Sequence, residues 1–186
     1  MSLFTSSRER RLWLWTLATL VAIYSTLGVA RVAVEFLRER NLLRVTVAVL
    51  LLMVAVTIAV GLVRRRPGRR EVAVALGFAF VSGLALVRMD RPEERTHLME
   101  YGLVAGLIYV ALEERRENGG RVPGGSWLLA VLGTAVLGWL DEGIQALLPS
   151  RVYDLRDVAF NAFAGLLAPS ALVLLERARE RDASTG

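Results

Sequence analysis

The amino-acid sequence predicts an all-α fold, a polytopic membrane helical bundle of about six transmembrane helices. Hydrophobic residues make up 54% of the 186-residue chain, whereas soluble domains contain about 45–50%. These residues gather in long runs without charge, and arginines stand between the runs. Together, the composition, the runs and the arginines exclude an ordinary soluble globular domain.

Three apolar runs lie in the first half of the chain. A helix needs about 20 residues, and at least about 17, to cross the hydrocarbon core, where only a helix satisfies its own backbone. The first two runs have 19 residues each and the third has 16; they are residues 12–30, 45–63 and 72–87. Residues 31–44 predict either a helix at the outer membrane surface or an extension of the first span.

Three further runs lie in the second half, at residues 98–112, 126–140 and 158–175. The first of them has 15 residues and carries one carboxylate, Glu100. The second also has 15, and its helix is expected to continue through Asp141 and Glu142 to Leu148. The third has 18. The two middle runs of the chain are long enough only if charged flanking residues cover the membrane interface.

Arginines set the expected orientation. If the N-terminus is cytoplasmic, the inner segments hold 14 arginines and the outer segments hold 9. This excess and the RRRPGRR turn at residues 64–70 place both termini inside by the positive-inside rule. The chain then forms a single domain, residues 1–186, with a polar C-terminal tail at 177–186. Its residues 179–186, RERDASTG, are expected to fray.

Composition excludes several classes of function. The chain has no Cys, one His and no Lys among its 23 basic residues, which excludes disulfides, zinc–cysteine sites, P-loops and Schiff-base chemistry. The sequence pI is about 10.6. We nevertheless predict no nucleic-acid partner, because arginines beside apolar spans set topology and contact anionic lipid.

Polar side chains gather at three places that this topology brings to the outer face. Residues three or four apart share one face of a helix, so the polar side chains are expected to form stripes. The three stripes are His97/Tyr101, Glu142/Gln145 and Asp157/Asn161/Gly165. A charge inside a span costs about 2.5–3.5 kcal/mol and faces a partner or a cavity. Elsewhere, Gly102 and Gly106 form a GxxxG pattern that predicts close helix packing.

The segment from Glu142 to Gly165 reads EGIQALLPSRVYDLRDVAFNAFAG. The chain resembles VanZ-like membrane proteins in two features. One is H-x-x-x-Y at His97 and Tyr101, and the other is the spacing of this segment, E-x-x-Q-x-x-x-P-x-R-x-x-D-x-x-D-x-x-x-N-x-x-x-G. The resemblance covers a core region at residues 97–169. Two positions depart from the family pattern, because Glu94 replaces a Lys and Pro169 replaces a Gly.

The resemblance implies a protein of the bacterial cytoplasmic membrane that is associated with glycopeptide (teicoplanin) resistance. We expect a polar site at the outer face that binds or modulates a lipid-linked or acylated envelope molecule, such as a cell-wall precursor or a lipoglycopeptide. An arginine fork suits a phosphate or carboxylate on such a ligand. The expected binding residues are His97, Tyr101, Glu142, Gln145, Arg151, Asp154, Asp157 and Asn161.

Other functions stay open from the residues. A membrane enzyme could use Glu142, Asp157 and His97 as acid and base on a lipid-linked substrate. No resident cofactor is predicted. A divalent metal held by His97 and carboxylates is the exception, with Mg²⁺ or Mn²⁺ suited to oxygen ligands better than zinc. The polar residues could also form a purely structural network, or belong to a transporter.

Overall fold

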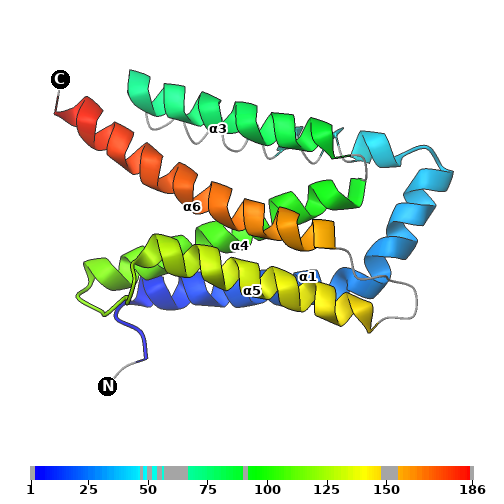
Figure 1. The fold of residues 1–186 in the computed structure, drawn as a ribbon, viewed down its shortest axis with the longest axis horizontal. Coiled ribbons are helices and arrows are strands. Elements are labelled where there is room, and N and C mark those ends of the chain that lie inside the picture. The colour runs from blue at the N-terminus through cyan, green and yellow to red at the C-terminus, as the bar shows by residue number, and fades with distance from the viewer. Residues whose placement is uncertain are drawn as a thin grey trace.

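The computed structural model describes residues 3–46, 48, 49, 52, 53, 56, 67–89, 92–147 and 155–184. These described residues form five long helices and no strand, which confirms the all-α prediction (Figure 1). In chain order the helices are α1 (Ser7–Glu39), α3 (Arg69–Arg88), α4 (Pro92–Glu117), α5 (Ser126–Ala146) and α6 (Leu155–Ala183). Each lies around one of the apolar runs. Most of the run at 45–63 lies outside the described residues.

Helix α1 begins at a capped N-terminus. The Ser6 hydroxyl accepts the backbone N–H of Glu9 at 2.9 Å, which satisfies one of the free donors of the first turn. The helix runs on to Glu39 and stops before Asn41, which has a φ of 55°. The residues that follow the first apolar run, as far as Glu39, therefore extend the first helix. Of the two alternatives for residues 31–44, this is the extension of the first span, and a separate surface helix is wrong as far as Glu39.

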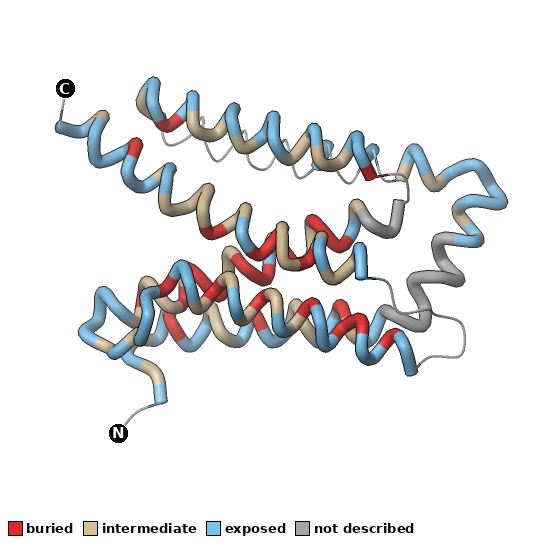
Figure 2. Tube along the Cα trace, viewed as in Figure 1, coloured by how far each residue is buried: buried red, intermediate tan, exposed pale blue. Residues whose placement is uncertain are grey.

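Helix α4 is the centre of the bundle and packs against α1, α5 and α6. Its buried side chains recur every three or four residues, because one face of a helix repeats at that spacing. They include Tyr101, Val104, Ala105 and Ile108. Figure 2 shows the buried positions concentrated along α4, α5 and the facing side of α6.

The predicted close packing at the GxxxG pattern of α4 is wrong for the part of the chain that the structure describes. A Cβ on Gly102 would meet no described atom within 4 Å, and one on Gly106 would meet only Leu172 at 3.9 Å. The close approach occurs instead between α5 and α6. There a Cβ on Gly165 would lie 3.0 Å from the Cβ of Thr134.

Helix α6 is longer than its apolar run. It continues through the buried Pro169 and ends at Ala183, so most of the tail that was expected to fray is helical. Contacts with α3 hold this last part in place. Arg179 Nη2 donates to Glu71 Oε1 at 2.9 Å, and Asp182 Oδ2 accepts the backbone N–H of Arg70 at 3.1 Å.

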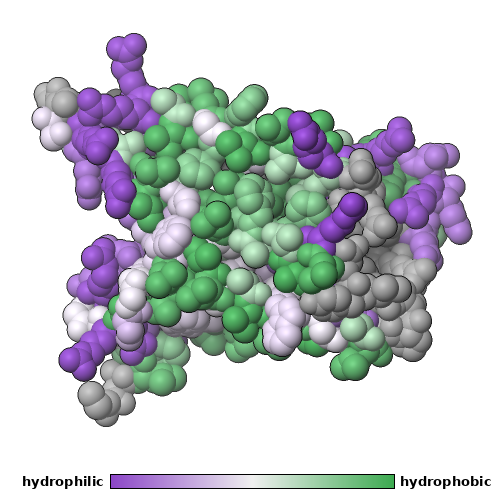
Figure 3. All heavy atoms as spheres, in the orientation of Figure 1, coloured by the Kyte–Doolittle hydropathy of each residue, from purple (hydrophilic) through white to green (hydrophobic). Residues whose placement is uncertain are grey.

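Three described helices, α3, α5 and α6, are long and apolar enough to cross a membrane. Helix α3 is the clearest example, because Glu71 is its buried residue. Its apolar side chains Leu76, Phe80 and Val87 are 65–78% exposed. An apolar surface of this kind is typical of contact with lipid. In Figure 3 an apolar band lies between two hydrophilic ends of the molecule, as a bilayer requires.

Candidate functional site

The candidate site lies where α4 begins, α5 ends and α6 begins. In Figure 1 these three helix ends meet at the right of the molecule, whereas both chain termini lie at the left. Most of the polar residues singled out in the sequence therefore share one end of the bundle. The four most deeply buried of them are Tyr101, Glu142, Gln145 and Asn161, each between 0 and 1% exposed.

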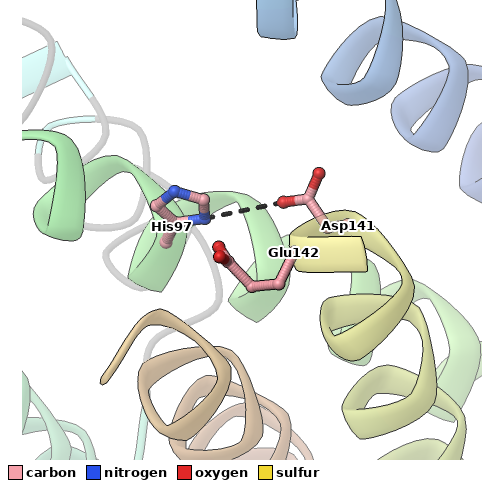
Figure 4. A group of neighbouring side chains, drawn as sticks. All are labelled: His97, Asp141 and Glu142. Carbon is pink, nitrogen blue, oxygen red and sulfur yellow. Dashed lines mark ion pairs between the residues drawn. The ribbon is translucent and has the colours of Figure 1, made fainter. Parts of the chain in front are cut away.

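At the centre of the site, His97 of α4 faces two adjacent carboxylates of α5. The side chains of Asp141 and Glu142 both point toward the imidazole (Figure 4). The distance from His97 Nδ1 to Asp141 Oδ2 is 3.8 Å. Both carboxylate residues are fully buried, and His97 is 5% exposed. The three side chains form what we call the HDE cluster.

The periodicity of α5 explains why its acidic residues point inward. Its buried positions recur about every four residues along one stripe, namely Ser126, Ala130, Thr134, Gly138, Asp141, Glu142 and Gln145. Small residues fill the first part of this stripe, so neighbouring helices approach closely there. The last turn carries the polar groups, and the same face that packs the bundle therefore brings them into the site.

Helix α6 enters the site through Asn161. Its Nδ2 donates to the carbonyl of Gly138 at 3.4 Å, a long hydrogen bond within the buried interior. Gly138 is required at this position because a Cβ would lie 2.5 Å from the Cβ of Asn161. One turn earlier, Asp157 is half-buried, nearer the end of the bundle.

Two tyrosines border the site on the side that faces the middle of the bundle. The hydroxyl of Tyr24, from α1, donates to the carbonyl of Leu137 at 3.1 Å, and the hydroxyl of Tyr101 donates to the same carbonyl at 3.4 Å. The Tyr101 ring also stacks on His97, with ring centroids 6.3 Å apart and an interplanar angle of 13°. Stacking and the hydrogen bond fix the ring beside the imidazole, so Tyr101 positions His97.

Several buried polar atoms of the site have no hydrogen-bond partner among the residues that the structure describes. They are His97 Nδ1, Gln145 Nε2 and Asn161 Oδ1. Leaving a buried donor or acceptor unsatisfied costs about 1–3 kcal/mol, so native proteins supply such groups with a protein, water or ligand partner. The site thus retains the capacity to bind a polar group.

The structure brings together most of the residues expected from the sequence. His97, Tyr101, Glu142, Gln145 and Asn161 are buried at one end, as predicted, and Asp157 lies half-buried on the α6 side. The expected residues Arg151 and Asp154 lie outside the described part of the chain.

The sequence reasoning did not include Asp141 in the site, although it is part of the HDE cluster. The signal that could have found it is the spacing of α5. Asp141 lies four residues before Gln145 and three after Gly138, so it belongs to the same buried stripe.

The opposite end of the bundle holds buried and paired charges of its own. The fully buried Glu9 accepts the backbone N–H and the hydroxyl of Thr5 at 2.6 and 2.7 Å, and Arg115 of α4 at 3.1 Å. Arg8 of α1 pairs with Glu114 of α4 at 2.8 Å. Burial raises the pKa of Glu9, but the hydrogen bonds from Thr5 and the charge of Arg115 outweigh it and leave the pKa below its ordinary value.

A groove of about 710 Å³ lies at this same end, between α4, α5 and α6. Its walls combine the carboxylates Glu113 and Glu176 with the indole of Trp127. The hydroxyl of Tyr109 donates to Glu176 Oε2 at 3.2 Å within the groove. The two carboxylates and the indole are at least partly exposed, whereas Tyr109 is buried. The Ser126 hydroxyl, which also lines the groove, is buried without a hydrogen-bond partner among the described residues.

Comparison with known proteins adds no further constraint. No family model matches the chain, and no curated protein or solved structure is similar to it.

Proposed function

We propose that the protein is a multi-pass protein of the bacterial cytoplasmic membrane, with about six spans and both termini in the cytoplasm. The 14 arginines on the proposed inner side, against 9 on the outer side, support this orientation. Helix α1 has 33 residues and α4 has 26. At about 1.5 Å per residue, each exceeds the thickness of the hydrocarbon core. In this orientation the HDE cluster faces the outer side.

The proposed function of this site is to bind a lipid-linked or acylated envelope molecule. The observation that carries the proposal is the unused hydrogen-bonding capacity of His97, Gln145 and Asn161 inside an apolar bundle. Such a site suits a ligand with a polar head and an apolar chain. The head group would meet Arg156 and Asp157 at the mouth of the site, while the chain would lie against the exposed apolar helix surface.

The VanZ-like resemblance, which rests on residue spacing, favours a cell-wall precursor or a lipoglycopeptide such as teicoplanin as the ligand. Both combine an apolar chain with polar groups that present hydrogen-bond donors and acceptors. An amide side chain such as Asn161 can satisfy both kinds of group. The proposed role is therefore in antibiotic resistance or another envelope process.

A membrane enzyme is the second candidate. The observation that favours it is the distance of 3.8 Å between His97 Nδ1 and Asp141 Oδ2. From this distance a small side-chain rotation would bring the carboxylate into a hydrogen bond with the ring. A carboxylate hydrogen-bonded to one imidazole nitrogen orients the ring and raises the basicity of the other nitrogen, which is how many general bases are arranged. His97 would then remove a proton from a substrate group, with Glu142 as the neighbouring acid.

The proposal is tested in cells that depend on the protein for glycopeptide tolerance. Asp157→Ala and Asn161→Ala are expected to abolish the tolerance and to leave the amount of protein in the membrane unchanged. Glu113→Gln, at the opposite end of the bundle, serves as the matched control and is expected to keep it. Full tolerance in both site variants would overturn the assignment of the binding site.

A further inference from the structure

The HDE cluster has the composition of a metal site. His97, Asp141 and Glu142 each offer one ligand atom, and these atoms lie within 4.8 Å of one another. All three side chains are buried, and His97 Nδ1 has no hydrogen-bond partner among the described residues. We propose that these three side chains bind one divalent first-row transition cation, of which Mn²⁺ is the representative probe.

The size of the cluster fits such an ion. Nitrogen and oxygen ligands lie about 2.0–2.2 Å from a divalent transition metal, so two ligand atoms on opposite sides of it are about 4.2 Å apart. The 3.8 Å from His97 Nδ1 to Asp141 Oδ2 is within this span. All three ligand atoms lie within 4.8 Å of one another, so small side-chain rotations would bring them around one ion.

Charge supports the same conclusion. Two carboxylates buried side by side in an apolar bundle are costly unless positive charge lies beside them. A divalent cation supplies such charge at the cluster.

The donor atoms select the class of ion. Carboxylate oxygens alone suit Mg²⁺ and Ca²⁺, whereas an imidazole nitrogen favours transition metals. One nitrogen with two carboxylates matches Mn²⁺ or Fe²⁺, and Zn²⁺ when a water completes the coordination. Among the residues that the structure describes, three side chains offer ligand atoms, and the remaining coordination positions of the ion would be filled by water or a bound group. The proposal concerns the ion alone and does not rest on the envelope ligand proposed above.

The test is a Mn²⁺ titration of the full-length protein, purified in detergent and first stripped of metal with a chelator. Electron paramagnetic resonance distinguishes free from bound Mn²⁺. We expect one saturable site per chain, with nitrogen coupling from His97 in the pulsed spectrum. Loss of outer partners alone weakens metal sites about 10–100-fold, so His97→Gln and Asp141→Asn, which remove direct ligands, are expected to weaken binding by more than about 100-fold.

Glu113→Gln is the matched control and is expected to bind as the unaltered protein does. Folding of each variant is checked by size-exclusion chromatography in the same detergent. If His97→Gln or Asp141→Asn does not fold, the nitrogen coupling in the unaltered protein decides whether His97 binds the ion. Three results would overturn the proposal: no saturable Mn²⁺ site, bound Mn²⁺ without nitrogen coupling, or unchanged affinity in folded variants of the cluster.

Discussion

At the scale of single residues, the site depends on glycines, which have no side chain, as much as on its polar side chains. The amide of Asn161 reaches the carbonyl of Gly138 because no Cβ stands between α5 and α6. The same holds at Gly165, which faces Thr134. These two contacts set the distance between the helices that carry the polar groups.

Substitution at Gly138 tests this dependence. In Gly138→Ala the added methyl would lie 2.5 Å from the Cβ of Asn161, and overpacking of this kind costs about 1–3 kcal/mol. Gly143→Ala is the control on the same helix, because a Cβ there meets no atom of the described residues within 4 Å. Both variants gain the same helix propensity. Unfolding by SDS, followed by tryptophan fluorescence, is expected to show Gly138→Ala less stable than Gly143→Ala by that amount, whereas equal stabilities would contradict the packing described.

The polar part of the site was largely readable from the sequence, and its packing was not. Glu142, Gln145 and Asn161 were predictable because polar residues in apolar runs must point inward. Gly138 gave no such signal, since glycine is common in membrane helices and only the neighbouring helix makes it necessary. The GxxxG pattern of α4 was misleading for the same reason, because spacing does not reveal which face a partner helix covers.

At the scale of helices, α4 holds the bundle together and is tied to α1 by charge as well as packing. Glu9 and Arg8 of α1 pair with Arg115 and Glu114 of α4 near the chain termini. These pairs lie at the end of the bundle opposite the HDE cluster (Figure 1). They fix the two helices in register, and through α4 they fix where His97 stands relative to α5.

Acid is expected to weaken this connection. The pKa of Glu9 is lower in the folded protein than its ordinary value of 4.5, so its ionised form stabilises the fold above that pH. The stabilisation is lost as the pH falls below 4.5 and through the folded-state pKa. In SDS-unfolding measurements across this range, the stability advantage over Glu9→Gln should shrink as the pH falls. An advantage that stays constant, or that grows in acid, would contradict this account.

The helices were predictable from the apolar runs, but their ends were not. The run at 98–112 lies inside α4, which extends from Pro92 to Glu117. Arg and Glu are good helix formers, so a helix continues past the last apolar residue into the charged flanks. A charge-free run therefore gives the shortest possible helix. The largest differences are at the C-terminal ends of α1, which continues to Glu39, and of α6, which continues to Ala183 and is held there by an ion pair with α3.

At the scale of the whole molecule, an apolar band separates two polar ends that differ in kind. The end with the termini holds Arg–carboxylate pairs, among them those of the buried Glu9 and Glu114, and the opposite end holds the buried HDE cluster. The arginine bias predicts that the second end faces outward. Since the chain has no Cys, single cysteines can report this orientation without background.

Leu147 and Arg121 are suitable positions for such cysteines. Leu147 is 83% exposed after α5, and Arg121 is exposed in the loop before α5. A membrane-impermeant maleimide is expected to label Leu147→Cys on intact cells, and Arg121→Cys only after the cells are permeabilised. The reverse pattern would invert the topology, and labelling of both on intact cells would contradict a membrane between them.

The central claim is that the buried polar end of the bundle is a ligand site, and native mass spectrometry tests it most directly. The full-length protein would be extracted gently from its own membrane, beside Asp157→Ala and the control Glu113→Gln. We predict a discrete lipid or lipid-phosphate adduct that Asp157→Ala loses and the control keeps. The absence of any specific adduct, or one that persists equally in all three proteins, would contradict the claim and leave the polar residues as a structural network.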